Sequence, residues 1–197
     1  MKDKRGNYLT IKIFLVFFLL GGCGGGGKDS PGVKMSATIT PTYNGGNTKS
    51  VDVVKGLCAT AQSGGTLDEY FADHDATVSI SASLINPSNV VKKLTVFIDR
   101  YTIDYRGLAD SPGAPPIQSD AREKTMSFSV SGESSASLEA TLSFVDLIRK
   151  NQYYNTVAGA LNNYTATYTF EGHSESGDSF SFTAQTDFEM GSFNNCK

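Results

Sequence analysis

Apolar and polar residues alternate along most of the chain from Val33 onward, which is the pattern of half-buried β-strands. Ser and Thr fill many of the positions between the apolar ones. The alternation covers residues 35–39, 78–84, 94–105, 126–130, 136–144, 164–170 and 180–188. Clusters rich in Gly, Pro, Ser and Asn separate these runs. The pattern therefore predicts about seven strands, the last two forming an antiparallel hairpin.

The alternation changes parity once within a run. Apolar residues occupy even positions up to Ile98 and odd positions from Tyr101 onward. An extra residue in a strand shifts parity in this way, so a β-bulge or sharp twist is expected at Asp99 and Arg100.

One segment has helical instead of strand spacing. Phe144, Leu147 and Ile148 fall on one face of a helix over residues 144–155. We expect a short helix that crosses between strands, and a second brief turn over residues 68–72.

Short strands without long intervening helices favour an all-β fold over any parallel α/β fold. The expected fold is a two-sheet antiparallel Ig-like β-sandwich of about seven strands with a short helical crossover. Residues 164–173 read YTATYTFEGH, and this pattern resembles the last strands of small bacterial Ig-like lipoproteins. The Cys, Trp, Cys spacing of antibody domains is absent, so the resemblance implies the architecture only.

The N-terminal segment has the composition of an export signal. Lys2, Lys4 and Arg5 precede an apolar stretch over residues 13–20. That stretch is shorter than the roughly 20 residues that a membrane-spanning helix needs.

The next four residues, Leu20, Gly21, Gly22 and Cys23, resemble the lipobox of bacterial lipoproteins. The resemblance implies cleavage before Cys23, a thioether-linked diacylglycerol on its thiol and acylation of its amino group. An ordinary cleavable signal with an incidental Cys23 is the alternative. The expected organisation is a signal peptide over residues 1–22, a lipidated Gly-rich tether over 23–32 and a β-sandwich over 33–197.

Charge bears on how this protein meets a membrane. The formal charge is −3, and removal of residues 1–22 takes away four basic residues and one acid, which leaves about −6. An acidic chain offers no basic surface to nucleic acid or to anionic lipid headgroups, so attachment rests on acyl chains. Gly24 follows Cys23, and in enterobacterial lipoproteins this favours the outer membrane.

Two cysteines remain after Cys23. An even pair in an exported protein suggests a disulfide between Cys58 and Cys196. The alternative is that Cys58 is a small buried apolar residue and Cys196 a free thiol near the chain end.

One acidic cluster invites comparison with calcium sites. With Asp73 as the first ligand of an EF-hand, Val78 stands where Gly is needed and Leu84 where Glu is needed. The motif fails, and a solvated loop without metal is expected. The cluster comprises Asp68, Glu69, Asp73, His74 and Asp75.

The segment over residues 171–178 contains Glu, His, Ser and Asp, the ingredients of a catalytic triad. Ser176 replaces the final Gly of a nucleophile elbow, and the segment joins two strands instead of a strand and a helix. A polar hairpin loop is expected. No cofactor motif occurs in the sequence.

These observations favour a lipid-anchored, non-catalytic cell-envelope module that binds or assembles, with a protein or glycan partner left open. Loops carry function on such folds, and the candidate ligand loop contains Ser111, Pro112, Gly113, Pro115 and Pro116. The alternative is an envelope hydrolase or a carbohydrate-binding accessory module. For that alternative the candidate aromatic platforms are Tyr101, Tyr105, Tyr153 and Tyr154.

Overall fold

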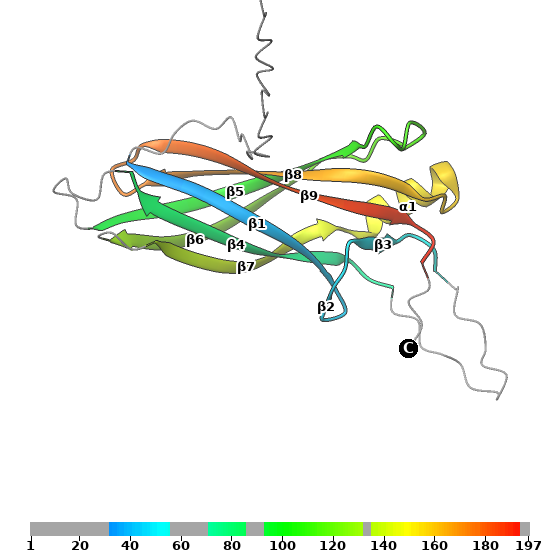
Figure 1. Cartoon of the computed structure of the whole chain (residues 1–197), viewed down its shortest axis with the longest axis horizontal. Helices are drawn as coiled ribbons and strands as arrows, with labels where there is room; N and C mark the ends of the chain where they lie inside the picture. Colours follow the sequence, from blue (N-terminus) through cyan, green and yellow to red (C-terminus); the bar gives the residue numbers. More distant parts are fainter. Residues whose placement is uncertain (1–31, 56–70, 86–92, 132–134, 194–197) are drawn as a thin grey trace, which may run out of the picture.

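The computed structural model describes residues 32–55, 71–85, 93–131 and 135–193 (Figure 1). Nine strands and one helix lie in these ranges, so the all-β prediction is confirmed. The strands are β1 (Val33–Tyr43), β2 (Gly46–Asn47), β3 (Ser50–Asp52), β4 (His74–Leu84), β5 (Lys93–Gly107), β6 (Asp120–Ser131), β7 (Ala136–Val145), β8 (Asn162–Ser174) and β9 (Ser179–Gly191). The helix is α1 (Leu147–Val157).

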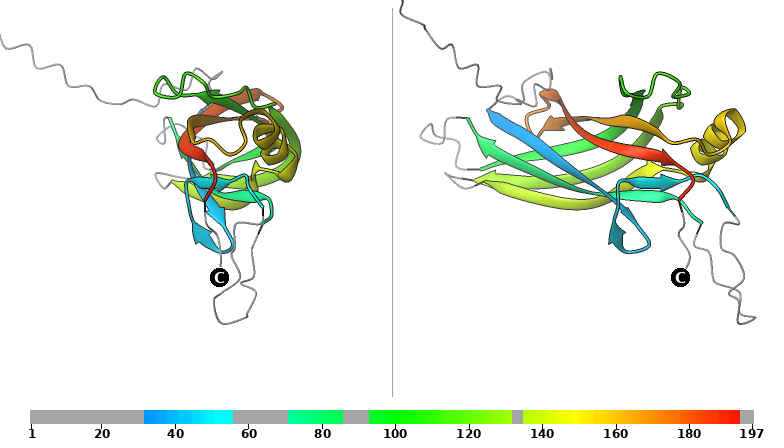
Figure 2. Two further views of the ribbon diagram at one scale, coloured as in Figure 1. Left: turned by 90° about the vertical axis from the view of Figure 1, so that its right-hand side faces the viewer. Right: turned by 45° about the vertical axis from the view of Figure 1, so that its right-hand side comes forward.

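The strands form two sheets that pack face to face (Figure 2). One sheet has the order β2-β1-β4-β7 and the other the order β3-β9-β8-β5-β6. The first sheet reproduces the A-B-E order of immunoglobulin sandwiches in β1, β4 and β7. The second sheet reproduces the G-F-C-C′ order in β9, β8, β5 and β6. The Ig-like prediction is therefore confirmed, and β2 and β3 are short additions to the seven long strands.

One short strand pair departs from the antiparallel pairing of the others. Strand β3 pairs with β9 in parallel, with Ser50 opposite Glu189 and Asp52 opposite Gly191. After β1 and the β2 turn, the chain crosses to the second sheet and runs beside its last strand, which places the two in the same direction (Figure 2). Three residues are too few for an alternation pattern to reveal this strand.

The core lies between the sheets and follows the predicted alternation. Val78, Ile80, Val96 and Ile98 are completely buried. Stacked and edge-on aromatic rings fill the middle and the α1 end of the sandwich. These rings belong to Tyr101, Phe144, Tyr164, Tyr168, Phe170, Phe182 and Phe188.

The predicted bulge in β5 is confirmed. The register of β5 shifts between Ile98 and Arg100 in its pairing with both β6 and β8. The shift keeps Ile98 and Tyr101 buried on either side of it. Arg100 consequently points to the outer face, where its side chain is 64% exposed.

The predicted helical crossover is present, but its buried face is not the predicted one. Helix α1 spans Leu147–Val157 between β7 and β8, begins with Asp146 as its N-cap and ends at Ala158 in a left-handed conformation. Leu147 and Ile148 are 36% and 66% exposed, while Phe144 belongs to β7. Arg149, Lys150 and Tyr153 are the residues that the helix buries. In the described part of the chain, no helix has the length and apolar character needed to cross a membrane.

Candidate functional site

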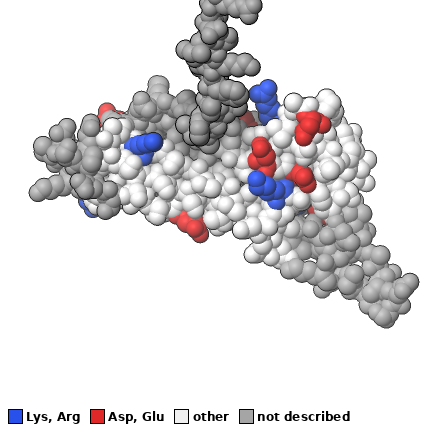
Figure 3. All heavy atoms as spheres, in the orientation of Figure 1, with Lys and Arg blue, Asp and Glu red and all other residues white. Residues whose placement is uncertain are grey.

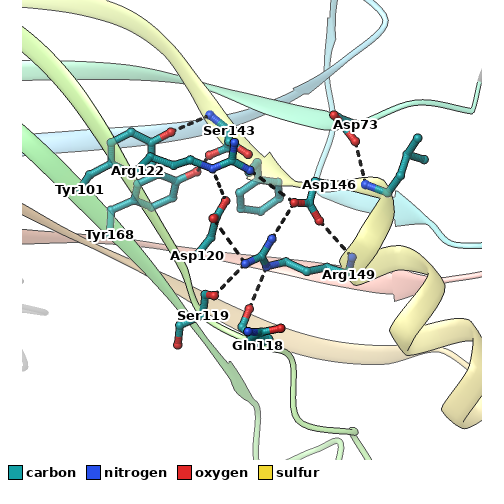
Figure 4. Close-up of polar contacts among 12 residues, drawn as sticks. Asp73, Tyr101, Gln118, Ser119, Asp120, Arg122, Ser143, Asp146, Arg149 and Tyr168 are labelled. Carbon is teal, nitrogen blue, oxygen red and sulfur yellow. Dashed lines mark hydrogen bonds and ion pairs between the residues drawn. The ribbon is translucent and has the colours of Figure 1, made fainter.

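Four charged side chains meet where α1 closes one end of the sandwich (Figure 4). Arg149 lies 2.6 Å from the carboxylate of Asp146 and 3.4 Å from that of Asp120. Arg122 lies 2.8 Å from Asp120 and 3.3 Å from Asp146, so each arginine contacts both acids. The carboxylate of Asp120, mainly by accepting a hydrogen bond, raises the pKa of Arg122 above its usual value. Two positive and two negative charges thus balance in a mostly buried cluster.

Arg149 also holds the backbone of the loop that leads into β6. Its guanidinium donates hydrogen bonds to the carbonyl oxygens of Gln118 at 2.8 Å and Ser119 at 2.7 Å. Asp146 in turn caps α1 by accepting a hydrogen bond from the Arg149 backbone N–H at 3.0 Å. The cluster therefore clamps a helix, a strand and a loop together, and its charges are engaged with one another.

The hydroxyl groups of three tyrosines meet the neighbouring β7 backbone. Tyr101 accepts from the Ser143 N–H at 3.2 Å, Tyr168 donates to the Ser143 carbonyl at 2.7 Å, and Tyr105 donates to the Phe144 carbonyl. Burial raises the pKa of Tyr105 and Tyr168 well above the usual value. These interior groups fasten one sheet to the other.

These contacts remove most of the predicted aromatic platforms. Tyr101 and Tyr153 are 4% and 2% exposed, and the hydroxyl of Tyr105 is committed to β7. Only Tyr154 of the four is well exposed, at 43%. Tyr101 and Tyr105 therefore belong to the alternating pattern because they face the interior, not because they form a binding surface.

A second buried polar group lies on the other side of α1. Lys150 donates a hydrogen bond to the Ala72 carbonyl at 2.5 Å, and its ammonium lies 4.9 Å and 4.6 Å from the ring centres of Tyr43 and Phe71. Burial lowers the pKa of Lys150 to about 8, against the attraction of the Asp52 and Asp73 carboxylates.

His74 also stacks on the Tyr43 ring, with centroids 3.8 Å apart. The side chain is completely buried, and neither ring nitrogen has a hydrogen-bond partner among the described residues. Burial lowers the pKa of His74 to about 3, and the charge of Lys150 adds to the shift. His74 is therefore neutral near pH 7.

The structure separates the described members of the predicted acidic cluster. Asp73 accepts a hydrogen bond at 2.7 Å from the Leu147 N–H at the start of α1, whereas His74 points into the core. Asp75 faces outward, and burial together with the nearby Asp73 charge raises its pKa. Within the described ranges, no group of three or more potential metal ligands comes together. Asp68 and Glu69 lie outside those ranges.

The predicted ligand loop lies at the same end of the molecule as α1 (Figure 1). It is bound to the start of β8, because Ser111 accepts a hydrogen bond from the Asn163 N–H at 2.8 Å and the Pro115 carbonyl accepts one from Tyr164 at 2.8 Å. Pro112, Gly113 and Pro116 are exposed. The loop is thus well anchored, with three residues open to solvent.

The segment over residues 171–178 comprises the end of β8, up to Ser174, and the hairpin turn that joins it to β9. His173 points outward to Asp99, with 2.8 Å between Nδ1 and the carboxylate, while Ser174 is buried. Ser174 contacts Ser176 at 2.7 Å, and Ser176 donates to Asp178 at 2.6 Å. The histidine and Ser174 therefore occupy opposite faces of β8 and do not form a triad.

Six residues predicted to matter lie outside the described ranges, so their roles stay predictions. They are Leu20, Gly21, Gly22, Cys23, Cys58 and Cys196.

Next to the β5 bulge, a hollow of about 740 Å³ crosses four strands of the five-stranded sheet. We call this the bulge hollow. Its lining comprises Asp99, Arg100, Glu123, Thr125, Glu171, Gly172, Ser179, Phe180 and Ser181. On the face shown in Figure 3, charged side chains are few, and most of them gather in one group of both signs on the right.

Three charged side chains of the bulge hollow are engaged in ion pairs or hydrogen bonds. Arg100 pairs with Glu171 through its guanidinium, and in the strand register it also lies opposite Glu123. Asp99 is held by His173, whose ring stacks on Phe97 with centroids 5.0 Å apart. These side chains are 42–64% exposed, so they remain accessible while paired.

The sequence predicted the bulge, but it did not predict the site beside the bulge. Asp99 and Arg100 were predicted only as the point where the strand changes parity. Glu123 and Glu171 lie 48 residues apart in sequence and meet Arg100 only through strand pairing. The signal that could have located them is the bulge itself, because bulges re-aim side chains and are frequent beside functional sites.

Comparison with protein-family models, with curated proteins and with solved structures gave no match. The class that the fold defines is the all-β, immunoglobulin-like sandwich. Function must therefore be argued from this chain's own residues.

Proposed function

We propose that this protein is a lipid-anchored, non-catalytic binding module of the bacterial cell envelope, attached by acyl chains on Cys23, with the outer membrane as its site. The Leu20–Gly21–Gly22–Cys23 match supports the anchor. Two or three acyl chains give stable attachment where a single chain does not. The Gly-rich residues 24–27 then separate the anchor from the sandwich that starts at Val33.

The bulge hollow is the observation that carries the binding role. Its volume of about 740 Å³ lies within the range of roughly 300–1,000 Å³ typical of small-molecule sites. Three of its four charged groups, Asp99, Arg100 and Glu171, are paired before any ligand arrives, which reduces the cost of ordering them on binding. The buried clusters around Arg149 and Lys150 are occupied in holding α1, so they support a structural role.

The same hollow favours the carbohydrate-binding alternative over the hydrolase. Hydrolysis of a glycosidic bond requires two carboxyl groups placed as acid and base or nucleophile. Here Glu171 is engaged by Arg100 and Asp99 by His173, so these carboxylates are arranged as hydrogen-bonding groups. That pairing supports binding without catalysis.

The anchor is tested by metabolic labelling with a palmitate analogue in cells that express the wild type or Cys23→Ala. We expect label on the wild type only, and accumulation of unprocessed precursor in the variant. Cys58→Ala is the matched control and should keep the label. Equal label on the wild type and Cys23→Ala would contradict the proposal.

A further inference from the structure

We infer that the bulge hollow binds a neutral oligosaccharide, with Arg100 and Glu171 as its central hydrogen-bonding pair. This inference rests on the proposed function and names its ligand class. It starts from the position of the hollow on the outer face of the sheet across β6, β5, β8 and β9. An extended chain can lie across such a face and continue beyond it at both ends.

The first step concerns the donors and acceptors that the hollow presents. A guanidinium only donates hydrogen bonds and a carboxylate only accepts them, whereas each sugar hydroxyl does both. Arg100 between Glu171 and Glu123 therefore offers donors beside acceptors, which matches neighbouring hydroxyls on a sugar ring. Hydrogen bonds to charged groups are the stronger ones, so a few of them can fix a ligand's orientation.

The second step concerns space and apolar contact. Ser179 and Ser181 have small side chains, so they leave room above the sheet. Phe180 is 3% exposed and belongs to the core, so it offers a ligand little surface. The apolar contact comes from the stacked rings of Phe97 and His173, on the cross-strand pair next to Ile98 and Gly172, because the C–H faces of sugar rings pack on aromatic rings.

The third step excludes other ligand classes by charge. Three carboxylates and one guanidinium line the hollow, which disfavours phosphates and acidic glycans. Arg100 at the centre disfavours a basic peptide. The described part of the chain brings no three metal ligands together, which disfavours a divalent cation at this place. A neutral, hydroxyl-rich chain is the ligand that remains.

The test uses the full chain, purified in a detergent without a sugar headgroup, and calorimetric titration. The probes are neutral hexasaccharides of glucose, mannose and N-acetylglucosamine, with hexagalacturonate and hexalysine as charged probes. Arg100→Ala removes the donors, Glu171→Gln removes one charge while keeping the shape, and Ser181→Trp fills the hollow. Arg106→Ala is the control, because Arg106 lies on the same strand and is exposed outside the hollow.

We expect the wild type to bind at least one neutral hexasaccharide. Arg100→Ala and Ser181→Trp should weaken that binding at least tenfold, Glu171→Gln several-fold and Arg106→Ala less than twofold. Thermal unfolding of each variant verifies that it folds. Arg100 and Ser181 both lie on the outer face, so we expect their variants to fold. If one of the two variants is unstable, the other still tests the binding site.

Three results would overturn the inference: no neutral hexasaccharide binds, Arg106→Ala weakens binding as much as Arg100→Ala, or only a charged probe binds. In the last case the site still binds a ligand, so the proposed binding module survives while the glycan assignment fails. Mass spectrometry of the sugar after incubation tests the proposed function separately. Shortened sugar chains would contradict the non-catalytic function, but they would not contradict the sugar-binding site.

Discussion

At the scale of single residues, the end of the sandwich places His74 and Lys150 where ionisable groups are costly. Both side chains are completely buried, and both lie against the ring of Tyr43. Desolvation disfavours the charged form of a base, which is why the pKa of each is lowered. The ammonium of Lys150 contacts a backbone carbonyl and two aromatic rings. The ring nitrogens of His74 have no hydrogen-bond partner among the described residues, and the ring is neutral.

This arrangement predicts a loss of stability in acid. His74 titrates near pH 6.5 in the unfolded chain and near 3 in the native state, so only the unfolded chain gains the proton between these values. The stabilisation is present above pH 6.5 and lost as pH falls, by about 2 to 3 kcal/mol between pH 7 and 4.5. Denaturant titrations of wild type and His74→Phe at both pH values measure it.

The variant is expected to lose less stability in acid than the wild type by about that amount. His173→Asn is the control, because this histidine lies on the outer face. Parallel pH dependence in wild type and His74→Phe would show that His74 does not carry the effect.

At the scale of elements, α1 is held by charges instead of an apolar stripe. Its inner face carries Arg149, Lys150 and Tyr153, while Leu147, Ile148 and Tyr154 are exposed. Most helices of globular proteins are arranged the other way round. The position of α1 therefore depends on the ion pairs that link it to β6.

Arg149→Ala should accordingly destabilise the fold by about 3 kcal/mol or more, because Asp120 and Asp146 would lose a partner while remaining buried. Denaturant unfolding measures the change. Arg106→Ala removes an exposed arginine and should change stability by less than about 0.5 kcal/mol. If both variants unfolded alike, the clamp would not be a main support of α1.

The bulge also depends on one residue of β8. A Cβ on Gly172 would lie 2.0 Å from the Phe97 carbonyl oxygen and 3.0 Å from the Ile98 Cα, both backbone atoms. Gly172→Ala should therefore cost about 3 kcal/mol or more of stability, since neither strand can yield easily. Gly113→Ala, where nothing lies within 4 Å, should stay within about 0.5 kcal/mol. Similar unfolding midpoints for the two variants would contradict this account of the bulge.

The elements differed in how far the sequence could predict them. Strands with one buried face alternate visibly, so the long strands and the β5 bulge could be predicted from residues 33–188. Helix α1 was predicted from Leu147 and Ile148, but its orientation depends on Asp120 and Arg122, which come from another strand. Contacts between distant segments leave no local spacing, and for the same reason the bulge hollow could not be predicted.

At the scale of the whole molecule, the parallel β3–β9 pair joins the beginning of the domain to its end. Asp52 accepts hydrogen bonds from the Val54 N–H at 3.1 Å and the Phe193 N–H at 3.2 Å. Both segments leave this pair in the same direction. Cys58 follows Asp52 by six residues and Cys196 follows Gly191 by five, and both cysteines lie outside the described residues, so the disulfide stays a prediction.

Oxidation of Cys58 and Cys196 should stabilise the protein by up to about 5 kcal/mol, because the bond would close a loop of more than 100 residues. Alkylation of the exported protein without reductant, followed by mass spectrometry, is the measurement. The expected result is two blocked cysteines that become reactive after reduction. Two alkylated cysteines in freshly prepared folded protein would contradict the bond.

The central claim is that a folded immunoglobulin-like domain is held at a membrane by lipid on Cys23. Mass spectrometry of the N-terminal peptide from the protein's own membrane fraction tests it most directly. The account predicts a chain that begins at Cys23 and carries the mass of a diacylglycerol on sulfur. An unmodified Cys23 in a chain that keeps residues 1–22, or that is cleaved elsewhere, would contradict it.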